Sequence, residues 1–251
     1  MFDHNFHINI MKHLQQLQPD LNAYTVTFDS SLLSSIRTMF DDYLRERLER
    51  EGYAYLFTGM EKIDIQMKLE DLQFHVTSYD TAPLLWISNN NAQTYNIFKT
   101  FMNDLDIMDD IKELVDYENH IEVYCGFFVV GKKMDRQTWH KDYVDGANAY
   151  TLITPLFDLD DSHGNLMYKD KDSVNHTYQY KMNEAVVFGD GFEHATEPYP
   201  ETNNLRVMLS FTFGTDKTEY WDILKQTIDS QSNYMILPCG HEKGTCQCFS
   251  V

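Results

Sequence analysis

The sequence predicts a mainly β protein with a helical N-terminal half, in which helices flank an antiparallel sandwich or jelly-roll core. From residue 121 onward, short segments rich in β-branched and aromatic residues follow one another, with turn residues and no helical pattern between them. Before residue 121, apolar residues recur at intervals of three and four, which is the spacing of amphipathic helices. Because no repeat or Pro/Gly/Ser-rich linker divides the chain, we expect one compact domain.

Three regions are expected within that domain. Residues 1–120 are predicted to form a helical or mixed supporting region, residues 121–216 the β core, and residues 217–251 a C-terminal helix and a cysteine-rich tail. The first predicted helix has Asp29 or Ser30 as its N-cap and ends at Gly52. The predicted helices cover residues 31–51, 92–104, 109–116 and 218–230. The predicted strands cover residues 121–131, 149–159, 165–170, 176–181, 184–190 and 206–214.

The composition narrows the class of function. The chain has 251 residues, of which 43% are hydrophobic, enough for one sizeable core. It carries 39 acidic against 20 basic side chains, a net charge of −19. This charge repels phosphate backbones and anionic lipids, so we expect neither a nucleic-acid nor a membrane partner.

The location is expected to be cytoplasmic. The first twenty residues lack the continuous apolar stretch of a secretory signal, and no run of about 18 apolar residues could cross a membrane. Only four cysteines are present, and three of them lie in the last thirteen residues, which is not the spacing of a secreted disulfide scaffold.

Three side chains are candidate metal ligands. His140 and Asp142 stand two apart at the expected start of a strand, where side chains at i and i+2 point to the same face. His194, on a later strand edge, could supply the third ligand. Two histidines and one carboxylate leave three positions open on an iron ion, although other divalent metals also accept such ligands.

Arg206 is a candidate anchor for a carboxylate. It follows His194 by twelve residues and begins the next predicted strand. A dicarboxylate that chelates a metal through its 2-oxo acid end buries its far carboxylate, which then needs a charged, hydrogen-bonding partner. The planar guanidinium group can bind such a carboxylate through two hydrogen bonds.

The ordered set of His140, Asp142, His194 and Arg206 resembles the motif of the 2-oxoglutarate/iron(II)-dependent dioxygenase superfamily. The segments TLITPLFDL, HGNLMY and VVFGDGFEHATEP look most like the prolyl-4-hydroxylase-like branch of that superfamily. The resemblance covers roughly residues 124–214. One departure is the turn that this branch writes as Gly-Gly, which reads His163-Gly164 here.

The resemblance implies a double-stranded β-helix, a jelly roll with the metal between its two sheets. It implies Fe(II), O2 and 2-oxoglutarate as co-substrate, with oxidative decarboxylation to succinate and CO2 and, usually, hydroxylation of the substrate. The carboxylate of Asp142 argues for hydroxylation, because halogenating members carry a small residue there. We expect a small molecule or amino acid as the substrate. The alternatives are hydroxylation of a protein side chain of the prolyl type, or a non-catalytic, metal-containing jelly-roll binding module. The oligomeric state stays open.

Supporting roles are less specific. Tyr124, Thr151 and Ser210 lie on predicted core strands and could place a hydroxyl group on a co-substrate carboxylate, but ordinary sheet residues would look the same. Isolated histidines in strands and turns are usually structural. We interpret four of them in that way: His75, His120, His163 and His176.

The C-terminal tail offers a second metal site. Cys239, His241, Cys246 and Cys248 lie within ten residues and could form a Cys₃His structural zinc site. Free thiols in the tail, or a disulfide, are the alternatives.

Overall fold

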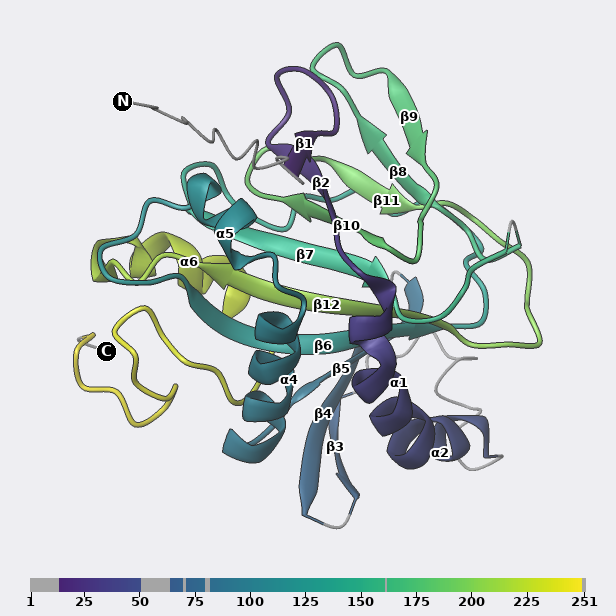
Figure 1. The fold of residues 1–251 in the computed structure, drawn as a ribbon, viewed down its shortest axis with the longest axis horizontal. Coiled ribbons are helices and arrows are strands. Elements are labelled where there is room, and N and C mark those ends of the chain that lie inside the picture. The colour runs from purple at the N-terminus through teal and green to yellow at the C-terminus, as the bar shows by residue number, and fades with distance from the viewer. Residues whose placement is uncertain (1–13, 51–63, 70, 80–81, 161, 250–251) are drawn as a thin grey trace, which may run out of the picture.

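The computed structural model describes residues 14–50, 64–69, 71–79, 82–160 and 162–249. In this part of the chain, two antiparallel sheets form the body of the protein (Figure 1). The larger sheet contains, in spatial order, β1 (Leu14–Gln16), β2 (Ala23–Thr27), β10 (Glu184–Phe188), β7 (Ala149–Pro155), β12 (Arg206–Gly214), β6 (Glu122–Gly131), β5 (Ala82–Asn89), β4 (Leu72–Tyr79) and β3 (Asp64–Leu69). The smaller sheet contains β11 (His194–Thr196), β8 (Leu166–Lys169) and β9 (Asn175–Tyr178).

The chain from β6 to β12 passes back and forth between the two sheets. After β6 it enters the smaller sheet at His140, which forms an antiparallel bridge with His194 at the start of β11. It returns for β7, crosses for β8 and β9, returns for β10, crosses for β11 and returns for β12. This alternation is the double-stranded β-helix, so the predicted jelly-roll core is confirmed.

The N-terminal region is mixed, and its description as a helical half was wrong. Strands β3, β4 and β5 form an antiparallel meander that extends the larger sheet beyond β6. The missed signal is an alternation of period two: Phe74 and Val76 on β4, and Leu85 and Ile87 on β5, all point into the core. A search for helical spacing does not detect it.

The predicted helices mostly agree with the structure. The first is a 3-10 turn (Ser30–Leu33), α1 (Ser34–Met39), a π-helical segment (Phe40–Arg45) and α2 (Glu46–Glu49) in succession. Asp29 caps it by accepting a hydrogen bond from the Ser31 backbone N–H at 2.9 Å, and the expected end at Gly52 lies outside the described residues. The remaining helices are α4 (Ala92–Asp104), α5 (Met108–Ile111) with a 3-10 turn (Lys112–Leu114), and α6 (Trp221–Ile228) after a 3-10 turn (Thr218–Tyr220). Among the described helices, none has the length and apolar character that crossing a bilayer requires.

Successive side chains of β12 point alternately into the main core and into a cavity between the two sheets. Val207, Leu209 and Phe211 point into the main core, where residues of α1 and α4 cover the outer face of the larger sheet (Figure 1). Arg206 and Ser210 point to the opposite face, toward the smaller sheet. Burying each large apolar side chain contributes about 1.5–3 kcal/mol, so one face of this strand holds the position of the other.

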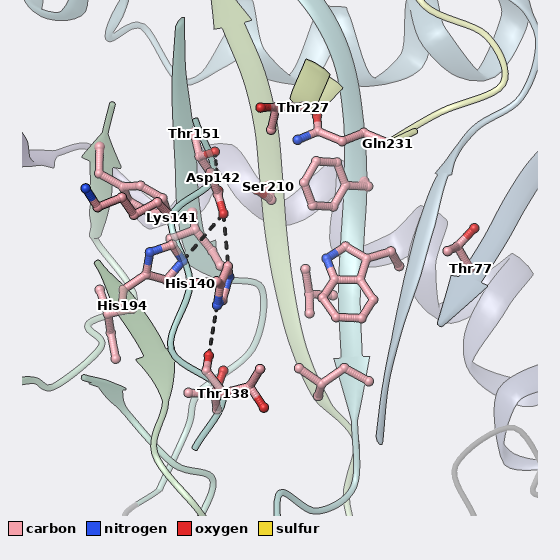
Figure 2. Close-up of a pocket in the computed structure, with 18 of the residues that line it drawn as sticks. Thr77, Thr138, His140, Lys141, Asp142, Thr151, His194, Ser210, Thr227 and Gln231 are labelled. Carbon is pink, nitrogen blue, oxygen red and sulfur yellow. Dashed lines mark hydrogen bonds and ion pairs between the residues drawn. The ribbon is translucent and has the colours of Figure 1, made fainter. Parts of the chain in front are cut away.

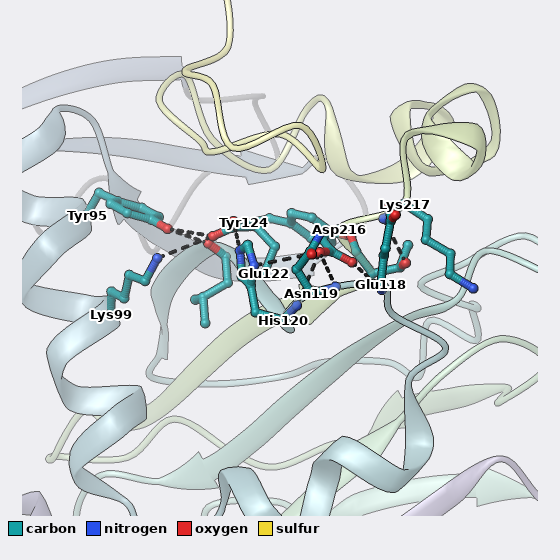
Figure 3. Close-up of polar contacts among 11 residues, drawn as sticks. Tyr95, Lys99, Glu118, Asn119, His120, Glu122, Tyr124, Asp216 and Lys217 are labelled. Atoms are coloured by element: carbon teal, nitrogen blue, oxygen red, sulfur yellow. Dashed lines mark hydrogen bonds and ion pairs between the residues drawn. The ribbon is translucent and has the colours of Figure 1, made fainter.

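A buried carboxylate joins the end of β12 to the segment that precedes β6. Asp216 accepts hydrogen bonds from the backbone N–H groups of Glu118 (2.7 Å), Asn119 (2.8 Å) and His120 (3.1 Å) (Figure 3). Burial by itself would raise the pKa of Asp216, but the three backbone donors outweigh it and hold the pKa below its ordinary value.

We predict that Asp216→Asn lowers the free energy of unfolding by about 1.5–3 kcal/mol at neutral pH, because a charged acceptor is lost. Since the folded-state pKa is depressed, this stabilisation is present above the unfolded pKa of about 3.9 and disappears as the pH falls below it. Urea unfolding between neutral pH and the acid range measures the difference. Asp222→Asn, at an 87% exposed side chain, is the control. Equal stability of the Asp216 variant and the parent at every pH would contradict the prediction.

Candidate active site

The two candidate histidine ligands are brought together by backbone hydrogen bonds. The N–H of His140 donates to the carbonyl of His194 at 3.0 Å, and the N–H of His194 donates to the carbonyl of His140 at 2.9 Å. Residues opposed in this way carry their side chains on the same side of the sheet. The two imidazole rings accordingly lie 4.3 Å apart, measured between centroids (Figure 2).

Asp142 completes the cluster. Its Oδ1 atom lies 3.5 Å from Nε2 of His140 and 3.7 Å from Nε2 of His194. One ligand atom from each of the three residues lies within 4.8 Å of the other two, close enough for all three to bind one ion. The structure therefore brings together the three residues that the sequence singled out.

The contacts of the two histidines bear on which ring nitrogen can bind a metal. Nδ1 of His140 lies 2.9 Å from the carbonyl oxygen of Thr138, so Nδ1 carries the proton and the Nε2 lone pair is free for a metal. Burial lowers the pKa of His194 to about 4, although the neighbouring Asp142 acts in the opposite direction. His194 is therefore neutral near pH 7, the form that binds metals.

The Asp142 carboxylate is oriented by Thr151. The Thr151 hydroxyl donates to Oδ2 of Asp142 at 2.7 Å, and the Tyr143 hydroxyl lies 3.0 Å from the same Thr151 oxygen. Because the Thr151 hydroxyl donates to Asp142, its oxygen can accept a hydrogen bond from Tyr143. The hydrogen bond from Thr151 occupies one carboxylate oxygen and leaves Oδ1 facing the histidines.

A cavity of about 530 Å³ lies between the two sheets beside these ligands. One wall is largely apolar and comes from β5 and β6 (Trp86, Phe127 and Val129). A polar rim comes from α6 and the segment after it. Figure 2 shows Thr227 and Gln231 of this rim on the same side of the cavity as Thr151.

Arg206 lines the same cavity and is only 2% exposed. Its Nε atom has no hydrogen-bond partner, and no carboxylate of the described residues lies within ion-pair distance of it. The ring of Tyr180 lies 5.5 Å from the guanidinium carbon, and Arg206 opposes the rise that burial causes in the pKa of Tyr180. A buried cation without an anionic partner is costly, so this geometry favours an anionic ligand.

The other predicted hydroxyl residues have different outcomes. Thr151 faces the cavity but holds Asp142. Ser210 lines the cavity and donates its proton to the carbonyl of Leu152 at 3.0 Å. Tyr124 does not reach the cavity, because its hydroxyl donates to the carbonyl of Thr215 at 2.6 Å. The pairing of β12 with β6 skips Tyr124 in a bulge.

The tail residues also converge. Ligand atoms of Cys239, His241, Cys246 and Cys248 lie within 4.8 Å of one another. All four cysteines of the chain are free thiols.

The four histidines interpreted as structural each have a carboxylate partner. His75 lies 2.8 Å from Asp64, His120 lies 3.0 Å from Glu122, His163 lies 2.8 Å from Asp160 and His176 lies 2.8 Å from Asp170. Among the described residues, none of the four belongs to a group that could hold a metal ion. His163 stands in the turn that reads His163-Gly164 in place of Gly-Gly. The second residue of this turn, Gly164, has a φ of +68°, which only glycine adopts readily.

Several cavity residues were missed in the sequence. Tyr180 follows β9 and reaches Arg206, while Trp86 and Gln231 come from the N-terminal meander and the C-terminal segment. Only Tyr180 had a local signal, because it alternates with Tyr178 on the predicted strand.

Solved structures share this fold. HygX from Streptomyces hygroscopicus, in a crystal structure with nickel and 2-oxoglutarate bound, aligns at 10% identity and a TM-score of 0.50, over 78% of this chain and 83% of that one. SnoN, a non-haem α-ketoglutarate-dependent epimerase from nogalamycin biosynthesis, aligns at 10% identity and a TM-score of 0.51, over 78% of each chain. This chain has the fold of the 2-oxoglutarate/iron-dependent oxygenases.

At these identities the likeness establishes the oxygenase fold and no more. A Pseudomonas putida prolyl-4-hydroxylase also aligns, at 14% identity over 78% of this chain and 94% of that one, but its TM-score of 0.44 does not single out the prolyl-4-hydroxylase-like branch. No protein-family model matches the sequence, and the search of curated proteins found no match.

We predict that Thr151→Val weakens binding of Fe(II), or of Mn(II) as a stable probe, by about 10–100-fold, because Asp142 loses the donor that orients it. Titration of the purified protein with either metal measures the affinity. Thr154→Val is the matched control, because Thr154 lies on the same strand and donates to the carbonyl of Glu184 at 3.1 Å, away from the cavity. Equal losses of metal affinity in both variants would mean that Thr151 acts through the fold and not through Asp142.

Proposed function

We propose that the protein is a 2-oxoglutarate- and Fe(II)-dependent oxygenase that hydroxylates a small molecule or an amino acid and releases succinate and CO2. The observation that carries this proposal is the buried guanidinium of Arg206, whose Nε has no hydrogen-bond partner, in the same cavity as the candidate ligands His140, Asp142 and His194. A jelly-roll module that only bound a metal would have no use for a buried cation there.

The residues present fit the cofactor and the co-substrate. Two imidazoles and one carboxylate are the ligand set of non-haem iron oxygenases, and bound Fe(II) supplies the activation of dioxygen. Arg206 would bind the far carboxylate of 2-oxoglutarate, where its free Nε and adjacent nitrogen can donate in parallel. Tyr180, beside the guanidinium, would help to shield this ion pair from water.

The protein itself supplies position and exclusion of water. Thr151 holds the Asp142 carboxylate, and Thr138 holds the ring of His140. The apolar wall of β5 and β6 faces the substrate side of the cavity and keeps water from the reacting centre. A retained carboxylate ligand at Asp142 favours hydroxylation over halogenation.

A small substrate fits the dimensions and the polarity of the cavity. Its volume of about 530 Å³ falls within the range of small-molecule sites. Aromatic residues on one wall and amide and hydroxyl groups on the rim suit a compact molecule with both apolar and polar parts. HygX also has a crystal structure with hygromycin B bound, which supports this substrate class. The free cysteines agree with action in the reducing cytoplasm, which we include in the proposal.

Release of succinate from 2-oxoglutarate tests the activity. We expect turnover by the Fe(II)-loaded protein in air, at least slow turnover without a substrate, and none by Asp142→Ala, which removes a metal ligand. Asp145→Ala, at an exposed carboxylate of the same segment, should keep the parent activity. No succinate from protein shown to contain Fe(II) would contradict the proposal and favour a binding module.

The anchor is tested separately by Arg206→Met. We predict that 2-oxoglutarate binds this variant about 30–1000-fold more weakly, because a charged partner of the buried carboxylate is removed. Metal affinity should stay unchanged. Calorimetric titration of the anaerobic, Mn(II)-loaded protein with 2-oxoglutarate measures the affinity.

Lys141→Met is the matched control, since Lys141 is the other cationic side chain among the described residues that line the cavity. It is exposed, so its loss should change 2-oxoglutarate affinity little. A large loss of 2-oxoglutarate affinity in Lys141→Met, with none in Arg206→Met, would contradict the prediction and show that Lys141 binds the far carboxylate.

A further inference from the structure

The last part of the chain has little regular structure of its own. After α6 ends at Ile228, the described residues 229–249 contain no helix or strand beyond one isolated bridge, Ile236 with Glu242. Two turns fold this segment back: Gly240 N–H donates to the carbonyl of Leu237 at 2.8 Å, and Thr245 N–H donates to that of Glu242 at 3.2 Å. The buried side chains of Met235 and Leu237 attach its first part to the body of the protein. Ordering the rest of the segment costs conformational entropy.

These turns bring four soft or borderline ligand atoms to one point. The Sγ atoms of Cys239 and Cys246 lie 3.3 Å apart. Nδ1 of His241 lies 3.4 Å from Sγ of Cys248 and 4.0 Å from Sγ of Cys246. Around a tetrahedral zinc ion, with Zn–S near 2.3 Å and Zn–N near 2.0–2.1 Å, neighbouring ligand atoms are separated by about 3.5–3.8 Å.

We propose that Cys239, His241, Cys246 and Cys248 bind a structural zinc ion that fixes the C-terminal tail. Three thiolates and one imidazole suit zinc, and four protein ligands fill its tetrahedral shell, so the ion has no open position for catalysis. Binding of the metal supplies free energy of folding to a segment that otherwise lacks regular structure.

A disulfide would not account for the whole arrangement. A bond between Cys239 and Cys246 would leave Cys248 and the ring of His241 without a reason to converge on the same point. A metal ion uses all four side chains at once.

The zinc site would brace one rim of the oxygenase cavity. Gln231, which lines the cavity, accepts a hydrogen bond from the Thr212 hydroxyl of β12 at 2.7 Å. A few residues later, the carbonyl of Tyr234 accepts from Nδ2 of the fully buried Asn89 at 2.5 Å. The same segment continues through the buried Met235 and Leu237 to Cys239. A zinc ion that fixes residues 239–248 would therefore hold the rim residues of the cavity in position.

Metal content of the full chain, produced in zinc-supplemented medium and purified under reducing conditions, tests the proposal. We expect about one zinc ion per chain, from one tetrahedral site. The double variant His140→Ala/His194→Ala should keep this zinc, because it removes only the metal site between the sheets. Failure of the oxygenase proposal therefore leaves this result unchanged.

Variants of the tail should lose the zinc selectively. Cys246→Ser and Cys248→Ser should contain none, and their tails should become accessible to protease, whereas Cys248→His should keep the ion because imidazole replaces thiolate as a ligand. Cys125→Ala, at the buried thiol outside the cluster, is the matched control and should keep the zinc. Where a serine variant does not fold, removal of zinc from the parent by a chelator should produce the same protease sensitivity.

Three results would overturn the proposal. They are a parent protein that contains no zinc, zinc that remains in both serine variants, and a Cys239–Cys246 disulfide in protein that has not been exposed to an oxidant.

Discussion

The site depends on one pair of backbone hydrogen bonds, the antiparallel bridge between His140 and His194. The two residues are far apart in the sequence, and this bridge joins the segment after β6 to the smaller sheet, together with a second bridge between Met134 and Tyr199. The bridge between the histidines places both imidazoles side by side, and Asp142 reaches them from a bend two residues after His140, where the sequence had predicted the start of a strand. A jelly roll provides such a bridge because successive strands alternate between its two sheets.

A second constraint is the alternation of β12. The outward residues of this strand pack in the main core against the N-terminal helices, and this packing holds the inward residue Arg206 beneath the surface without an acidic partner. The packing that stabilises the core therefore also buries the positive charge of Arg206 at the cavity, which is electrostatically unfavourable. The proposed co-substrate explains why such an arrangement would be kept: its far carboxylate would neutralise the charge, and its binding would strengthen the folded state.

The sequence predicted the parts of the structure that depend on local pattern. Most strands from β6 onward, helix α4, the three candidate metal ligands and Arg206 follow from periodicity, residue chemistry and order along the chain, whereas β11 was not among the predicted strands. The meander β3–β5 was missed because its signal is an alternation of period two, whereas the N-terminal region was interpreted by helical spacing. The hydrogen bond of the Tyr124 hydroxyl to the carbonyl of Thr215 and that of Thr151 to Asp142 could not be foreseen, because both contacts are tertiary.

A crystal structure of the anaerobic protein with Mn(II) and 2-oxoglutarate tests the central claim most directly. The account predicts one ion bound by Nε2 of both histidines and by Oδ1 of Asp142, with the 2-oxo acid end of the co-substrate on the ion and its other carboxylate on Arg206. A co-substrate whose far carboxylate lies against Lys141, or an ion that lacks either histidine, would contradict it.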